Sequence, residues 1–282
     1  QHSLGLRENT RIIIGSSDGC MATLGAGVYE EGKATVTLEE SGAVRVISKQ
    51  VLQDDKQRLF NYLLTDGNYV SGGPTNNAGS VFEWYAMQFG DFKKAFDLEE
   101  CIEDLIRDAA KVEPGSGGLI FLPYLQGERA PIWNANARGA YFGLNIKHEQ
   151  RHMIRATIEG IMYTIYSIGK TLEEHRAINS LSANGTFASF PFWTQMMADV
   201  FNKPVHIKQG TGSDSVALGS FLLSATELGL YKNLDEAAEM VVLPDSFHPH
   251  AGNHHVYQKH FLIFERLINK LKDEFDSITE LQ

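Results

Sequence analysis

The chain has 282 residues, of which 43% are apolar and 21% charged, proportions typical of a folded globular protein and not of a disordered one. Its 35 acidic residues outnumber 25 basic ones, and the net charge of −10 argues against a surface for nucleic acid or anionic membrane. Two cysteines are too few for a disulfide framework, and neither a signal peptide nor an apolar run of membrane-spanning length is evident, so we expect a cytoplasmic protein.

The first 50 residues are predicted to be rich in β-structure. The apolar run Ile12-Ile13-Ile14 predicts a strand over residues 11–14, directly before the stretch GSSDGCMATLGAG. Two more strands are predicted over residues 34–38 and 43–47 with a turn between them, and the pattern continues over residues 58–65.

One carboxylate, Asp18, stands among the small residues of GSSDGCMATLGAG. Glycine and serine at the start of a helix leave backbone N–H groups free and let a ligand approach closely. Asp18 is therefore a candidate for orienting or deprotonating a reacting hydroxyl. The alternative interpretation is that Asp18 only caps a helix.

The middle of the chain combines predicted helices with an irregular segment. A Gly/Asn-rich loop leads into a helix predicted over residues 77–89, and a second helix with one apolar face is predicted over residues 98–111. A short buried strand is expected within EPGSGGLIFLPYL. The next segment, PYLQGERAPIWNANARGA at residues 123–140, has no hydrophobic period but carries many side chains able to bind a ligand.

The last part of the chain alternates strands and helices. From His152 an isoleucine stripe predicts a core helix, and a strand–loop–helix unit follows over residues 180–201. Two further helices are predicted over residues 215–228 and 256–275. This alternation predicts an α/β fold, and because no Pro- or Ser-rich linker divides the chain, we expect one compact domain.

Five histidines near the C-terminus invite comparison with a metal site. They occur at positions 248, 250, 254, 255 and 260, around Gly252-Asn253. No cysteine lies among them and their spacing is not that of a ligand set, so we predict solvent-exposed histidines on a loop and no metal-ligating group.

Four segments, taken in chain order, resemble the C-terminal domain of the FGGY family of carbohydrate kinases. They are GSSDGCMATLGAG, GGPTNNAGSVFEW, PYLQGERAPIWNANARGAYFGL and GTFASFPFWTQMMADVFNKPV. Residues 139–159 also fit the family's C-terminal signature, G-x-aromatic-x-G-Leu followed by His152-Met153, Ala156 and Glu159. The resemblance covers residues 10–272 and looks most similar to gluconate kinases, with xylulose kinases next.

The resemblance implies an α/β domain of the RNase H-like, actin-like ATPase fold. It would be the C-terminal, ATP-binding half of a two-domain sugar kinase, whose sugar-binding N-terminal domain is absent from residues 1–282. Members transfer the γ-phosphate of MgATP to a sugar hydroxyl, so ATP and Mg²⁺ are the implied cofactors. A sugar or sugar acid, most similar to gluconate, and the missing N-terminal domain are the implied partners, and a homodimer is left open. We expect the chain alone to be inactive.

The resemblance also implies which residues form the site. The family's catalytic aspartate matches Asp18, which would accept the proton of the attacking hydroxyl as general base, a role suited to phosphoryl transfer. The implied nucleotide-binding residues are Glu40, Ser41, Gly42, Gly79, Glu83, Gly185 and Thr186. The loop at 123–140 adds Glu128 and Arg129 on the substrate side; the alternative is a structural loop held by an Arg–Glu pair and a buried tryptophan.

Two places depart from the family pattern. Glu39-Glu40 stand where similar kinases have Gly-Thr, which puts two carboxylates in a turn that lies against the ATP phosphates. Like charges about 4 Å apart cost roughly 4 kcal/mol at an effective dielectric constant of about 20. Thr186 replaces the second glycine of a Gly-Gly pair, which adds bulk and predicts backbone strain. These departures leave a second interpretation open, a non-catalytic nucleotide-sensing or scaffolding module derived from a sugar kinase.

Overall fold

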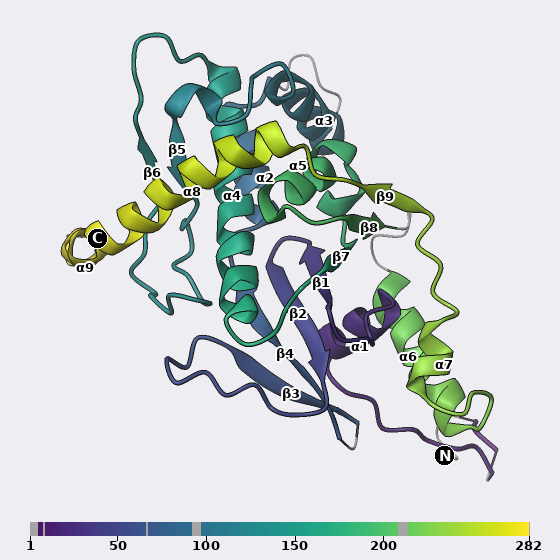
Figure 1. The fold of residues 1–282 in the computed structure, drawn as a ribbon. Helices are drawn as coiled ribbons and strands as arrows, with labels where there is room; N and C mark the ends of the chain where they lie inside the picture. The colour runs from purple at the N-terminus through teal and green to yellow at the C-terminus, as the bar shows by residue number, and fades with distance from the viewer. Residues whose placement is uncertain (1–4, 8, 66, 92–96, 208–213, 282) are drawn as a thin grey trace.

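A mixed seven-stranded β-sheet forms the centre of the molecule (Figure 1). The computed structural model describes residues 5–7, 9–65, 67–91, 97–207 and 214–281. The strands are β1 (Lys33–Leu38), β2 (Gly42–Ser48), β3 (Phe60–Thr65), β4 (Asn68–Thr75), β7 (Ser180–Asn184), β8 (Val205–Ile207) and β9 (Asp245–Phe247), while β5 (Ile120–Leu122) and β6 (Ala140–Phe142) pair separately. The order β3-β4-β2-β1-β7-β8-β9 is antiparallel from β3 to β1, parallel from β1 to β8, and antiparallel again at β9.

Helices cover both faces of this sheet (Figure 1). They are α1 (Asp18–Gly25), α2 (Gly79–Phe89), α3 (Leu98–Ala109), α4 (Gln150–Glu173), α5 (Pro191–Phe201), α6 (Asp214–Glu227), α7 (Leu234–Ala238), α8 (Ala251–Lys270) and α9 (Lys272–Thr279). Successive side chains of β2 point to opposite faces of the sheet, as in any β-strand. Val44 and Val46 join the larger core with α2 to α5 and α8, whereas Ile47 joins a smaller core with α1, α6 and α7.

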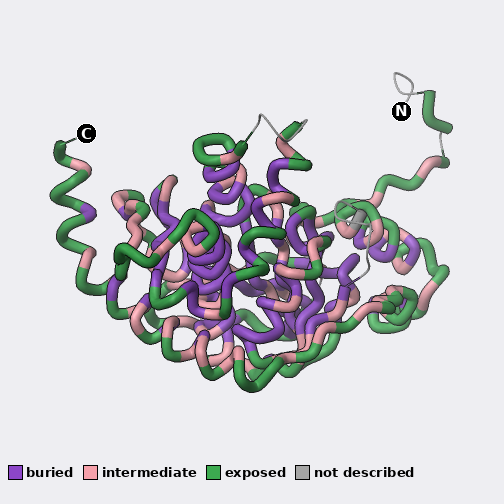
Figure 2. The backbone as a smooth tube through the Cα atoms, turned by 90° about the horizontal axis from the view of Figure 1, so that it is seen from above, coloured by how far each residue is buried: buried purple, intermediate pink, exposed green. Residues whose placement is uncertain are grey.

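Helix α4 is the centre of the larger core. The isoleucines of its predicted stripe, at positions 154, 158, 161, 165 and 168, are all at most 1% exposed. In Figure 2 the buried residues gather in the middle of the molecule, whereas both ends of the chain are mostly exposed. The α/β fold class and the helical prediction for this segment are confirmed.

Helices α1 and α6 touch backbone to backbone. A Cβ atom on Gly25 would collide with the carbonyl oxygen of Ser215, and one on Gly219 would collide with the carbonyl oxygen of Met21. Only glycine permits so close an approach of two main chains. The contact fixes α1, whose first residue is Asp18, relative to the start of α6.

A buried ion pair on α4 ties three parts of the larger core together. Arg155 Nε lies 2.9 Å from Glu159 Oε1, and the two side chains are 6% and 2% exposed. Glu159 also accepts hydrogen bonds from the N–H of Gly115 and the hydroxyl of Ser116. Arg155 donates to the Tyr257 hydroxyl of α8 at 2.6 Å. Glu159 of the signature is thus a structural cross-link between α4, the segment after α3, and α8.

Two predicted elements are wrong. Residues 11–14 form no strand, and Ile12 and Ile14 are 76% and 91% exposed, because no strand in the described part of the chain hydrogen-bonds to this segment. The predicted helix over 256–275 is two helices, since Leu271, with φ −94° and ψ 4°, leaves helical geometry between α8 and α9. The other predicted strands and helices are confirmed within a few residues.

The C-terminal histidines also lie differently from the prediction. His254 and His255 belong to α8 and not to a loop, whereas His260 lies in α8 as the helix predicted over residues 256–275 requires. The backbone N–H of His250 donates to Asp199 Oδ1 at 2.8 Å, and His254 Nδ1 lies 2.9 Å from the Asp199 carbonyl oxygen. Within the described ranges, no group of three or more His, Cys, Asp or Glu side chains is arranged to hold a metal ion.

None of the helices described above is both long and apolar enough to cross a membrane. Even α4, with 24 residues, carries charged and polar side chains along its length.

Replacing Glu159 with alanine is expected to lower the free energy of unfolding by about 3–5 kcal/mol, because it leaves the buried Arg155 guanidinium without its counter-charge. Urea denaturation followed by circular dichroism measures the change. The control is Asp108→Ala, which removes the partner of Lys111 from an exposed pair and should cost less than about 1 kcal/mol. Equal losses in the two variants would contradict the structural role of Glu159.

Candidate active site

Asp18 is the first residue of α1 and is exposed. The helix is capped by Ser17, whose side-chain oxygen accepts a hydrogen bond from the N–H of Cys20 at 3.3 Å. Among the described residues, Asp18 Oδ1 accepts a hydrogen bond from the neighbouring N–H of Gly19 alone, at 2.7 Å. The capping role considered for Asp18 therefore belongs to Ser17, and the Asp18 carboxylate remains available to a ligand.

A cavity of about 340 Å³, here called the Asp18 cavity, lies beside this carboxylate. It is lined by the start of α1, by β1, β2 and the turn between them, by the end of β7 and by the start of α6. The lining residues are Asp18, Gly19, Ala22, Thr37, Glu39, Glu40, Ser41, Gly42, Arg45, Asn184, Ser215 and Val216. The structure thus brings together four residues that the sequence nominated, namely Asp18, Glu40, Ser41 and Gly42.

The two departures from the family pattern contact each other. Glu39 Oε2 accepts hydrogen bonds from the N–H of Thr186 at 3.1 Å and from its hydroxyl at 2.8 Å. Thr186 has φ −56° and ψ −47°, an ordinary helical conformation, so the predicted strain is absent. Gly185 carries the unusual backbone instead, with φ +98°, and a Cβ there would collide with the Leu38 carbonyl oxygen.

Gly79 and Glu83 belong to α2 and do not line the Asp18 cavity. Gly79 is buried, and its N–H donates to the carbonyl oxygen of Glu39 at 2.8 Å. Burial and the charge of Glu40 together raise the pKa of Glu83. The charge of Glu40 thus acts on Glu83, whereas the repulsion expected between this turn and the ATP phosphates stays a prediction.

Glu128 is a buried structural acceptor. It is 4% exposed and accepts hydrogen bonds from the Thr75 hydroxyl at 2.6 Å, the Asn77 amide at 3.1 Å and the N–H of Arg129 at 2.6 Å. Burial raises the pKa of Glu128, and these hydrogen bonds act in the opposite direction. Glu128 thereby holds the loop against the end of β4 and the start of α2.

Arg129 and Trp133 do not hold this loop in the way that the structural alternative expected, through an Arg–Glu pair and a buried tryptophan. Arg129 Nη2 donates to the carbonyl oxygen of Thr75 at 3.0 Å, and no ion pair joins it to Glu128 among the described residues. Trp133 is 51% exposed, so it is not a buried anchor. The loop is fixed by Glu128 and its amide and hydroxyl donors, and not by an Arg–Glu pair.

Sequence reasoning missed Arg45, which lines the Asp18 cavity from β2. Its Nη1 donates to the Thr37 hydroxyl at 3.0 Å. The signal was a single charged residue in the otherwise apolar strand GAVRVIS. Asn184, at the end of β7, was also missed. Only the fold brings β2 and β7 to one cavity, and the sequence alone does not show this.

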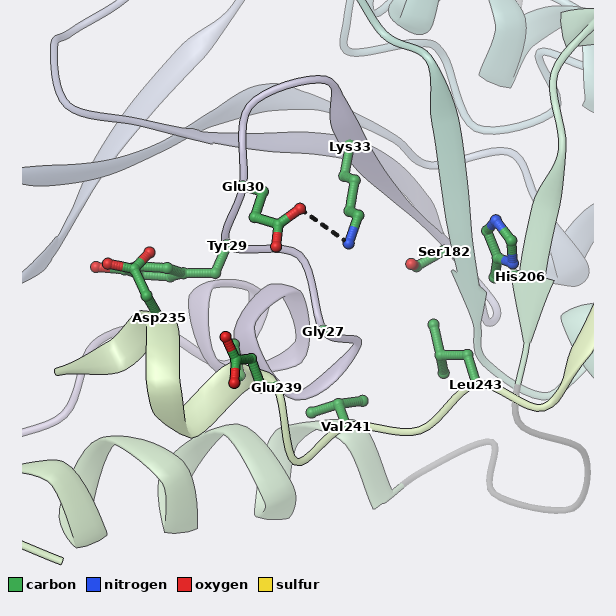
Figure 3. A pocket seen from close by; sticks show the side chains of 11 residues that line it. Gly27, Tyr29, Glu30, Lys33, Ser182, His206, Asp235, Glu239, Val241 and Leu243 are labelled. Atoms are coloured by element: carbon green, nitrogen blue, oxygen red, sulfur yellow. Dashed lines mark ion pairs between the residues drawn. The ribbon is translucent and has the colours of Figure 1, made fainter. Parts of the chain in front are cut away.

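A second cavity, of about 360 Å³, lies between α7 and the sheet (Figure 3). Three carboxylates, Glu30, Asp235 and Glu239, surround it, and Lys33 is paired with Glu30 at 3.2 Å. Burial and the charge of Lys33 lower the pKa of His206, which favours its neutral form. Both cavities carry three carboxylates and one basic side chain, but Lys33 is already paired, whereas no carboxylate of the described residues lies within 4.0 Å of Arg45, so the Asp18 cavity offers phosphate the freer positive charge.

Comparison with known proteins finds carbohydrate kinases by sequence and by structure. The profile described as "FGGY family of carbohydrate kinases, C-terminal domain" matches residues 37–228. Gluconokinase of Bacillus subtilis (strain 168) is 35% identical over 99% of this chain. The crystal structures of a ligand-bound xylulose kinase and of a gluconate kinase, both from Lactobacillus acidophilus, each superpose on 98% of the chain with a TM-score of 0.87, at 32% and 33% identity. The chain covers 55% of the length of each of these proteins.

Replacing Glu128 with glutamine is expected to lower the free energy of unfolding by about 1–3 kcal/mol, because an amide NH₂ would face donors that now meet an acceptor. Urea denaturation gives the value. The matched control, Glu113→Gln, changes an exposed glutamate and should stay within about 0.5 kcal/mol of the parent. If Glu128→Gln is as stable as the parent, the acceptor role assigned to this carboxylate is wrong.

Proposed function

The chain belongs to the FGGY family of carbohydrate kinases, and on this basis we propose that it is the nucleotide-binding half of a sugar kinase. The reaction would transfer the γ-phosphate of MgATP to a hydroxyl of a sugar or sugar acid. One observation carries the proposal: an exposed carboxylate, Asp18, shares a cavity with the β1–β2 turn and the end of β7. The fold is that of FGGY sugar kinases, an actin-like ATPase fold.

Asp18 is the proposed general base. Phosphoryl transfer requires little covalent chemistry from the protein and depends on positioning and on charge stabilisation. A carboxylate at the cavity wall accepts the proton of the attacking hydroxyl as its oxygen bonds to phosphorus. Mg²⁺ would enter with the nucleotide and neutralise part of the phosphate charge, while Asp18 acts on the hydroxyl.

We propose gluconate as the sugar substrate, with xylulose as the alternative. The support is the similarity to gluconokinase at 35% identity, against 31% for xylulose kinase of Staphylococcus epidermidis. Because the chain spans about half the length of these relatives, we further propose that a separate N-terminal half carries most contacts to the sugar. Residues 1–282 alone would then turn over little or no substrate.

A nucleotide-sensing or scaffolding role without catalysis is the second candidate. It is favoured by Glu39, which forms part of the wall of the Asp18 cavity and whose carboxylate is held there by Thr186. A negative charge fixed at a phosphate-binding turn weakens nucleotide binding. The intact Asp18 favours the enzyme.

Calorimetric titration of the chain with MgATP separates the two candidates. We expect a dissociation constant below about 1 mM, equivalent to at least ~4 kcal/mol of binding free energy.

After the chain is joined to its N-terminal half, Asp18→Asn should lower gluconate-dependent ADP release by about 10²- to 10⁴-fold while leaving MgATP affinity within about threefold. Absence of MgATP binding would favour the scaffolding role, MgATP binding without turnover in the joined chain would favour the nucleotide-sensing role, and full activity of Asp18→Asn would rule out the general-base role.

Restoring the family residues should strengthen nucleotide binding. We expect Glu39→Gly, Glu40→Thr and Thr186→Gly together to raise MgATP affinity at least about tenfold, equivalent to ~1.4 kcal/mol, because two negative charges leave the turn. Glu39→Gly and Thr186→Gly should be non-additive in a double-mutant cycle, since each is the other's hydrogen-bond partner. Glu113→Gln, a charge change far from the turn in sequence and exposed, is the control; an unchanged affinity in the triple variant contradicts the electrostatic explanation.

A further inference from the structure

Arg45 is the basic residue among the described side chains that line the Asp18 cavity. Its neighbours Val44 and Val46 point to the other face of the sheet, so its own side chain is directed toward α1. A Cβ atom on Gly19 would lie 2.9 Å from Arg45 Nη2. The guanidinium therefore lies directly against the start of α1, beside the residue that follows Asp18.

The guanidinium has far more hydrogen-bonding capacity than the protein uses. Arg45 Nη1 donates to the Thr37 hydroxyl at 3.0 Å, whereas a guanidinium carries five N–H donors. No carboxylate lies within 4.0 Å of it in the described part of the chain. Burial lowers the pKa of Arg45, and the charge of Asp18 opposes this effect. The positive charge is thus partly buried without an ion-pair partner.

Asn184 adds a second donor with no partner. The residue is 8% exposed, it lines the same cavity at the end of β7, and its Nδ2 atom is buried without a hydrogen bond to any of the residues that the structure describes. Buried amide donors almost always have an acceptor, so an unpaired donor on a cavity wall is available to an acceptor atom of a ligand. Arg45 and Asn184 belong to different strands, which makes these two observations independent.

Arg129 strengthens the same conclusion from outside the cavity wall. Its positive charge lowers the pKa of Arg45, which means that the two guanidinium groups are close enough to repel each other. Arg129 Nε is also buried without a hydrogen-bond partner. An anion bound at Arg45 would oppose this repulsion, as the charge of Asp18 already does.

We propose that Arg45 and Asn184 form an oxyanion site in the Asp18 cavity, in which the guanidinium binds two ligand oxygens and the amide donates to an oxygen of the same ligand. The planar fork of arginine matches both phosphate and carboxylate, so the oxyanion is either the terminal phosphate of the nucleotide or the carboxylate of a sugar acid. The identity of this ligand rests on the proposed function, whereas the anion site rests on the geometry alone.

The test is calorimetric titration of the chain with inorganic phosphate and, separately, with gluconate. We expect at least one of them to bind, Arg45→Gln to weaken that binding at least tenfold, and Asn184→Asp to weaken it as well, because it exchanges a donor for a negative charge. Arg45→Lys should restore part of the affinity, since it keeps the charge but not the fork. The matched control is Arg107→Gln on α3, an exposed arginine whose loss should change nothing.

The two arms distinguish the source of the oxyanion. Loss of phosphate affinity together with MgATP affinity assigns the site to the nucleotide, and loss of gluconate affinity alone assigns it to the sugar acid. Circular dichroism melting shows whether each variant remains folded. If Arg45→Gln does not fold, its place in the test is taken by Arg45→Lys. The inference is overturned if the parent binds neither anion or if Arg45→Gln binds both as tightly as the parent. Phosphate binding through Arg45 in a chain that does not bind MgATP would instead contradict the proposed kinase function.

Discussion

The backbone contact between α1 and α6 determines where Asp18 lies. Gly25 and Gly219 allow the two helices to meet without side chains between them. Since α1 is only eight residues long, fixing its middle and end also fixes its first residue. The same contact brings Ser215 and Val216 of α6 to the wall of the Asp18 cavity. A bulkier residue at this crossing would separate the carboxylate from the turn and strand end that complete the site.

The β1–β2 turn and the loop after β7 behave as one unit because Glu39 and Thr186 are hydrogen-bonded to each other. Each residue alone departs from the family pattern, but together they satisfy each other's polar groups. A carboxylate that accepts two hydrogen bonds is better tolerated beside a ligand than a free one. The two departures are therefore coupled: Glu39 and Thr186 form a side-chain hydrogen bond where the family pattern has small residues.

Local periodicity was sufficient to predict most helices and the central strands. The stripe on α4 repeats at the helical period, and every isoleucine in it is buried. Residues 11–14 have an equally apolar sequence but form no strand, because a strand depends on a partner that sequence periodicity does not reveal. Arg45 and Asn184 were missed on similar grounds, since only the strand order places them in one cavity with Asp18. Asp18 itself was found through its family motif and not through any period.

The arrangement of charges in the Asp18 cavity decides how a phosphate could enter it. In the proposed reaction a carboxylate and a phosphate must come close, and two negative charges about 4 Å apart repel by roughly 4 kcal/mol at an effective dielectric constant of about 20. Arg45 lies next to Asp18 and supplies an attraction of comparable size, whereas Glu40, on the turn, adds repulsion. A phosphate is therefore favoured at the end of the cavity formed by Arg45 and Asn184. Such a position leaves the Asp18 carboxylate beside the phosphate, where an attacking hydroxyl would have to approach.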